Sequence, residues 1–86
     1  MSIDEKVRKI IAGQAMVPVE EVRDEASPDD LGLDSLALVE IVFAVEEAFD
    51  ISVPFNANEP EQSDFDISTI SKIVAGVENL VREQGE

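Results

Sequence analysis

Ser35 is the residue of this chain best suited to a chemical step, because it stands between Asp34 and Leu36 where a loop gives way to a helical pattern. A nucleophilic serine needs a general base beside it, and histidine is the usual one. The chain of 86 residues contains no histidine, and it contains no cysteine that could supply a thiolate instead. The sequence therefore argues against Ser35 as the nucleophile of an enzyme.

Two other interpretations of Ser35 remain. Either Ser35 or Asp34 could cap the following helix, since both side chains accept hydrogen bonds from the amides of a first turn. Alternatively, Ser35 could carry a group that contains phosphate, because the free amides and the positive dipole end of a helix N-terminus favour an anion there. The spacing alone leaves both interpretations open.

Acidic residues gather ahead of this serine, and the cluster consists of Asp24, Glu25, Asp29, Asp30 and Asp34. A calcium-binding loop that began at Asp24 would place Pro28 at a ligand position and Asp29 where glycine is needed. A loop that began at Asp29 would place Leu31 and Leu33 at ligand positions. Carboxylates on the loops of so small a domain also lack an enclosed substrate pocket. We expect neither a metal site nor an enzyme.

The chain is strongly acidic, with 20 Asp and Glu against 6 Lys and Arg and a net charge of -14. Such a charge repels nucleic-acid phosphates and anionic membrane surfaces, and it attracts basic patches on partner proteins. The start MSIDEKVRKII lacks the apolar core of a secretory signal, and no apolar stretch approaches the roughly 20 residues that span a bilayer. We expect one monomeric, cytoplasmic domain over residues 1–86 that neither binds nucleic acid nor inserts into a membrane.

Three amphipathic patterns predict the helices that would position these residues. The first begins at the capping-box pair Ser2 and Glu5 and runs to about residue 16. The second spans residues 35–49 without a helix breaker and carries an apolar stripe along one side. The last is expected to begin after Ser68 as its N-cap and to continue through residues 70–81.

Long loops separate these helices. Residues 17–34 hold two prolines and a glycine, and Pro18 is expected to open a single helical turn. Residues 50–66 hold two more prolines, and a short helix is expected late in this linker. Since no segment alternates apolar and polar residues long enough to predict a strand, the fold class is all-α: a small four-helix bundle with a short third helix and long loops.

The stretch DDLGLDSLALVEIVFAVEEAFDISVP, residues 29 to 54, resembles the centre of acyl carrier proteins, in which an Asp-Ser-Leu triplet opens the second helix. The resemblance implies that Ser35 is the attachment site of 4'-phosphopantetheine, which a phosphopantetheinyl transferase delivers from coenzyme A. The terminal thiol of that group would hold an acyl group as a thioester, a role that suits a chain without cysteine. Asp34 would help to engage the transferase and its divalent metal.

The same resemblance implies two further sets of residues in a carrier that has no catalytic activity of its own. A partner-docking face would meet basic patches on acyl-loading and acyl-transferring enzymes, and it comprises Asp34, Glu40, Phe43, Glu46 and Glu47. Core residues would part to shelter the acyl chain between helices, namely Leu38, Val42, Val45, Phe49, Ile70, Ile73 and Val77. The expected pathways are fatty acid, lipid or polyketide biosynthesis.

Two departures from the family pattern and two rival functions accompany this prediction. Ala37 occupies a position that is often acidic in carriers of primary fatty acid synthesis, and the linker after Pro54, residues 55–66, is longer than usual, which suggests a specialised carrier. An aminoacyl or peptidyl carrier is the nearer rival, although Asp34 and the acidic second helix favour acyl cargo. The other is an unmodified acidic adaptor, in which Ser35 is only a helix cap.

Overall fold

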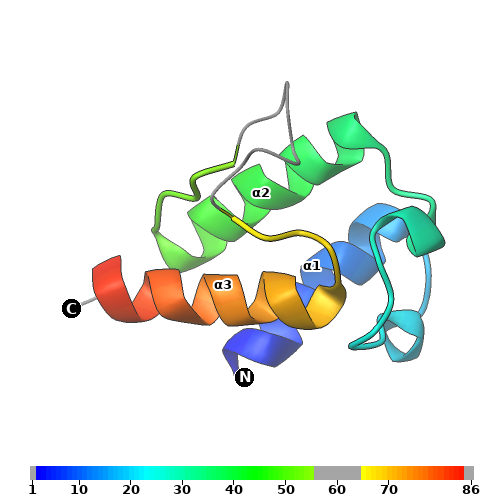
Figure 1. Ribbon diagram of the computed structural model, residues 1–86, viewed down its shortest axis with the longest axis horizontal. Helices are drawn as coiled ribbons and strands as arrows, with labels where there is room; N and C mark the ends of the chain where they lie inside the picture. Colours follow the sequence, from blue (N-terminus) through cyan, green and yellow to red (C-terminus); the bar gives the residue numbers. More distant parts are fainter. Residues whose placement is uncertain (1, 56–64, 85–86) are drawn as a thin grey trace.

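The computed structural model describes residues 2–55 and 65–84. It contains helix α1 (Ile3–Ala15), helix α2 (Ser35–Phe49) and helix α3 (Ile70–Gln84), with two short 3-10 helices, η1 (Val19–Glu21) and η2 (Asp29–Leu31), between α1 and α2 (Figure 1). No strand occurs in these described ranges, so the all-α class is confirmed. Nor is any described helix long and apolar enough to cross a membrane.

The short third helix that the sequence predicts late in residues 50–66 is not seen in the described part of the linker. Residues 50–55 and 65–69 contain no helix, and residues 56–64 lie outside the described residues. The bundle therefore has three α-helices where the structure describes it, and the fourth stays a prediction.

Helix α1 has the predicted N-cap. The Ser2 hydroxyl oxygen accepts a hydrogen bond from the Glu5 amide at 3.1 Å, as a capping serine does. At the other end Met16 adopts a left-handed backbone conformation with φ 59°, and its amide donates to the Ala12 carbonyl. This arrangement ends the helix where the apolar pattern predicts it to end.

Helix α3 begins differently from the prediction, because Thr69 caps it and Ser68 does not. The Lys72 amide donates to the Thr69 hydroxyl oxygen at 3.2 Å, and the Ile73 amide donates to the Thr69 carbonyl. Ser68 turns toward Asp66, whose Oδ1 accepts from both the Ser68 amide at 2.9 Å and the Ser68 hydroxyl at 2.6 Å. An aspartate readily takes the amide two residues on, and that local turn removes Ser68 from the cap.

The core lies where α1 packs against both α2 and α3. Val7 and Ile11 on α1 and Ile70 and Val77 on α3 are fully buried. Their spacings, four residues in α1 and seven in α3, place each pair on one helix face. Figure 1 shows the segment that follows residue 64, drawn in yellow, passing between α2 and α3. Loop residues therefore lie between α2 and α3, beside the site described below.

The acidic loop after α1 is fastened by Arg8. Its guanidinium pairs with Asp4 at 2.6 Å and with Asp24, and it also donates to the Val22 carbonyl at 2.8 Å. The hydrogen bond that the Arg8 guanidinium donates to Asp4 is the main reason that the pKa of Arg8 lies above its ordinary value, against the opposing effect of burial. Farther along the loop, the Ala26 carbonyl accepts from the Ile70 amide at 2.8 Å. These contacts connect the loop to both α1 and α3.

Candidate functional site

Asp34 caps α2 and leaves Ser35 free. Asp34 Oδ1 accepts a hydrogen bond from the Ala37 amide at 2.9 Å, and the Asp34 carbonyl accepts from the Leu38 amide at 3.0 Å. Ser35 is the first residue of the helix, its side chain is exposed, and its hydroxyl forms no hydrogen bond with another described residue. The capping role therefore belongs to Asp34, and the hydroxyl of Ser35 is accessible to another molecule.

The loop that presents Ser35 is shaped by a reciprocal pair of hydrogen bonds. The Asp30 amide donates to the Ser27 hydroxyl oxygen at 3.1 Å, and the Ser27 amide donates to Asp30 Oδ2 at 3.0 Å. Gly32 then takes a left-handed conformation with φ 75° and ends η2. A side chain there would meet nothing within 4 Å, so backbone geometry rather than crowding explains this glycine. Leu33 follows, buried in the core, and fixes the chain directly before Asp34.

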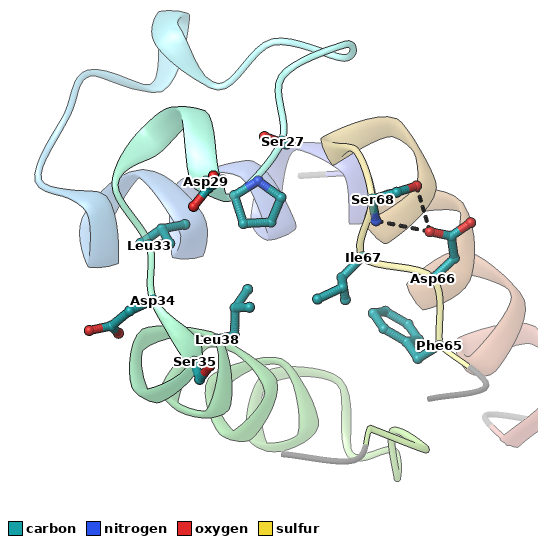
Figure 2. Close-up of a pocket in the computed structure, with 11 residues that line it drawn as sticks. Ser27, Asp29, Leu33, Asp34, Ser35, Leu38, Phe65, Asp66, Ile67 and Ser68 are labelled. Carbon is teal, nitrogen blue, oxygen red and sulfur yellow. Dashed lines mark hydrogen bonds between the residues drawn. The ribbon is translucent and has the colours of Figure 1, made fainter. Parts of the chain in front are cut away.

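A groove with a volume of about 820 Å³ opens beside Ser35. Figure 2 shows Ser35 and Leu38 of α2 on one side of it and Phe65 and Ile67 of the following linker on the other. Leu33 adds to the apolar wall. This size falls within the range of small-molecule sites, which are mostly apolar with a few polar groups.

Carboxylates lie at the polar edge of the same groove. Asp29, Asp34 and Asp66 line it together with the hydroxyls of Ser27 and Ser68. All three aspartates are exposed, so solvent screens their charge. The hydrogen bonds from Ser68 lower the pKa of Asp66 below its ordinary value of 3.8.

Residues 5–77 match the family model of the phosphopantetheine attachment site. The chain belongs to this family. Members carry 4'-phosphopantetheine as a covalently attached cofactor, and as carriers they interact with a phosphopantetheinyl transferase and with biosynthetic enzymes. The match includes all of α2 and its Asp-Ser-Leu start.

The residues present in this phosphopantetheine carrier fit the cofactor. A phosphate ester on Ser35 would stand at the N-terminus of α2, where the helix dipole and the free first-turn amides favour negative charge. Asp34 is the nearest carboxylate in the sequence, and its Oδ1 is already engaged by the Ala37 amide. The groove beside Ser35 offers apolar surface for whatever the thiol carries.

The acyl-sheltering residues predicted for this carrier occupy two different places. Leu38 alone lines the groove at Ser35. The remaining predicted residues that are buried lie in the core, namely Val42, Val45, Ile70, Ile73 and Val77, and Phe49 packs against it half-buried. Sequence reasoning missed Leu33, Phe65 and Ile67 as groove residues. The available signal was that Phe65 and Ile67 are isolated apolar residues in an acidic linker.

The predicted docking face of the carrier is largely exposed. Glu40, Phe43 and Glu47 point to solvent from α2, and the exposed fraction of Phe43 is 62%. Leu36, 69% exposed and seven residues before Phe43, lies on the same helix face. This residue was missed, although the helical spacing could have revealed it. We call the surface formed by Leu36, Glu40, Phe43 and Glu47 the α2 face.

Glu46 shares with Asp34 and Glu40 a hydrogen-bond partner within the chain, which is the Ala37 amide for Asp34 and Gln14 Nε2 for Glu40, but Glu46 is less exposed than the rest of the predicted docking face. It is half-buried, and its Oε2 accepts a hydrogen bond from the Val53 amide at 2.8 Å. The side chain thus supports the turn that follows α2. Its charge stays close to the α2 face, but one oxygen already has a partner within the chain.

Proposed function

We propose that this carrier bears 4'-phosphopantetheine on Ser35 and holds acyl groups as thioesters for enzymes of fatty acid, lipid or polyketide biosynthesis. The observation that carries the proposal is the exposed hydroxyl of Ser35 at the start of α2, released from capping by Asp34. It stands in a chain whose residues 5–77 match the phosphopantetheine family. The chain itself performs no catalysis under this proposal.

The attachment step joins Ser35 to the phosphate of the cofactor. Ser35 Oγ bonds to the phosphorus of the 4'-phosphate in coenzyme A, the pyrophosphate bond breaks, and adenosine 3',5'-bisphosphate leaves. The hydroxyl proton goes to the transferase, because the carrier has no histidine to receive it. Once attached, the group supplies a terminal thiol that can form a thioester.

Acyl cargo is favoured over aminoacyl or peptidyl cargo by the surroundings of Ser35. The apolar wall of the groove suits an aliphatic chain, because each methylene that is removed from water stabilises the bound chain. This wall is formed by Leu33, Leu38, Phe65 and Ile67. The aspartate directly before Ser35 and the acidic second helix point the same way. The aminoacyl or peptidyl carrier is the second candidate.

Partners would dock on the α2 face, with the neighbouring charges of Asp34 and Glu46. Two large apolar side chains exposed among glutamates suit an enzyme surface that combines an apolar depression with lysines or arginines. Charge complementarity of this kind raises the association rate and weakens as salt is added. A carrier must visit several enzymes and leave each one, which such contacts allow.

Intact-mass measurement tests the attachment. After incubation with coenzyme A and a promiscuous phosphopantetheinyl transferase, the wild-type chain should gain one phosphopantetheinyl group and Ser35→Ala should gain none. Ser71→Ala is a matched control, because Ser71 is also exposed in the first turn of a helix, and it should be modified normally. An unmodified wild type would leave the acidic adaptor as the better explanation. Equal modification of Ser35→Ala would exclude Ser35 as the attachment site and overturn the proposal.

A further inference from the structure

Phe65 lies between two cavities of the protein. One is the groove of about 820 Å³ that opens at Ser35. The other has a volume of about 390 Å³, lies against α3, and is lined by Pro54, Lys72, Leu80 and Glu83 among others. Phe65 and Asp66 line both, but Asp66 is exposed whereas only 6% of Phe65 is accessible to solvent. The aromatic ring is therefore the buried partition between the two spaces.

The ring is seated directly on the backbone of α3 at Gly76. A Cβ atom added to Gly76 would lie 2.7 Å from Phe65 Cε1, closer than such atoms can approach, and 3.2 Å from Cδ1, which is a tight contact. Glycine in the interior of a helix is otherwise unfavourable. Gly76 lies inside α3, so no turn requires a glycine at this position. Its absent side chain is what lets the ring of Phe65 lie in this position.

We propose that Phe65 forms the end wall of the groove at Ser35 and thereby limits the length of acyl chain that the carrier can shelter. The proposal rests on the proposed function and adds a specificity-determining residue to it. Each methylene of the cargo gains burial until the chain reaches the ring. A longer chain must either displace the ring from Gly76 or leave its end in water. The second cavity is the space that becomes continuous with the groove once the ring is removed.

Thioester protection as a function of chain length tests the wall. Wild type, Phe65→Leu and Phe65→Ala are loaded from acyl-coenzyme A of increasing length by the promiscuous transferase, and intact mass confirms the loading. Cleavage of each thioester by hydroxylamine is then timed. In wild type the protection should increase with chain length and reach a plateau. In Phe65→Leu, and more so in Phe65→Ala, the plateau should shift to longer chains.

Three further variants test whether Phe65 acts as a wall of the groove or only supports the fold. Ile51→Ala removes a buried apolar side chain that lines neither cavity, so it should keep the wild-type plateau length even where it lowers stability. Gly76→Ala forces the ring off the α3 backbone and should shift the plateau, whereas Gly76→Ala combined with Phe65→Ala should behave as Phe65→Ala alone. Phe65→Leu retains an apolar side chain and serves if Phe65→Ala does not fold.

The outcomes distinguish this proposal from the one on which it rests. Normal loading with the same plateau length in wild type, Phe65→Leu and Phe65→Ala would overturn the wall and leave the carrier function intact. An equal shift in Ile51→Ala would also overturn it, since general loosening would then explain the effect. A wild type that cannot be loaded at all would remove the carrier function, and the length limit with it.

Discussion

The side-chain amide of Gln84 pairs with both backbone polar groups of Ser52. The Ser52 amide donates to Gln84 Oε1 at 2.8 Å, and Gln84 Nε2 donates to the Ser52 carbonyl at 2.9 Å. This pairing joins the last turn of α3 to the chain that leaves α2, two segments 32 residues apart. It is a contact that only a side chain with both a donor and an acceptor can make.

Gln84→Glu should therefore destabilise the fold, because a carboxylate can accept from the Ser52 amide but cannot donate to the Ser52 carbonyl. The expected loss is about 1 kcal/mol of the free energy of unfolding, or about 4–8 °C in Tm for a domain of this size. Thermal unfolding followed by circular dichroism measures it.

The added negative charge is controlled by an exchange with the neighbouring residue. Glu83→Gln combined with Gln84→Glu leaves the net charge at -14, and it should lose nearly as much stability as Gln84→Glu alone. Recovery of the wild-type Tm in this double variant would show that charge, and not the paired hydrogen bonds, caused the loss.

Two substitutions of Asp34 separate its capping role from its charge. Asp34→Asn keeps an oxygen that can accept from the Ala37 amide, so its stability should be close to wild type. Asp34→Ala removes the cap and should cost about 1 kcal/mol in urea unfolding. If Asp34 also engages the transferase through its charge, Asp34→Asn should be modified more slowly despite its normal stability. Equal rates of mass gain for wild type and Asp34→Asn would restrict Asp34 to capping.

The prediction of fold and site succeeded where the determinants are local. The bounds of α2, Ser35 and Phe49, follow from a continuous apolar stripe without a breaker, and the structure has the same bounds. The prediction of the N-cap of α3 was wrong because Ser68 and Thr69 are adjacent candidates. Ser68 is instead hydrogen-bonded to Asp66 in a turn that lies outside the helical pattern, and Thr69 caps the helix. Periodicity within a helix contains no information about such a turn.

The rest of the site depends on contacts between distant segments. The sequence spacing does not predict the contact between Phe65 and Gly76. A glycine inside a helical pattern could equally be an unfavourable residue or a position where a ring packs against the backbone. Glu46 lies beside Glu47 in the sequence, and only the turn after α2 brings the Val53 amide to its carboxylate. Residue type predicts what chemistry is available, whereas tertiary contact decides which groups remain free for it.

Acid titration should detect the hydrogen bonds that Asp66 accepts from Ser68. Because the folded-state pKa of Asp66 is lowered from 3.8, its stabilising effect is present above the unfolded pKa and is lost as the pH falls through the folded pKa. In Ser68→Ala the Asp66 carboxyl, followed by NMR, should titrate at higher pH and closer to 3.8, since the largest cause of the shift is the side-chain bond. An unchanged titration in Ser68→Ala would contradict the hydrogen-bond assignment.

The α2 face should matter for partner recognition and little for folding. Phe43 and Leu36 are mostly exposed, so Phe43→Ala and Leu36→Ala should change the free energy of unfolding by less than about 0.5 kcal/mol. If Phe43 is a central anchor of the complex with the transferase, its truncation should cost more than about 1 kcal/mol of binding, which corresponds to a kcat/KM at least roughly fivefold lower.

The charges of that face should act differently from its apolar residues. Glu47→Gln should slow modification mainly at low salt, because a charge at the edge of an interface acts chiefly on the association rate and is screened as ionic strength rises. Glu78→Gln removes the same charge from an exposed position on α3 and should leave kcat/KM nearly unchanged. Equal effects of the two substitutions would mean that the transferase responds to the net charge of -14 as a whole. A localised effect at Glu47 would place the contact on α2, the helix that begins at Ser35.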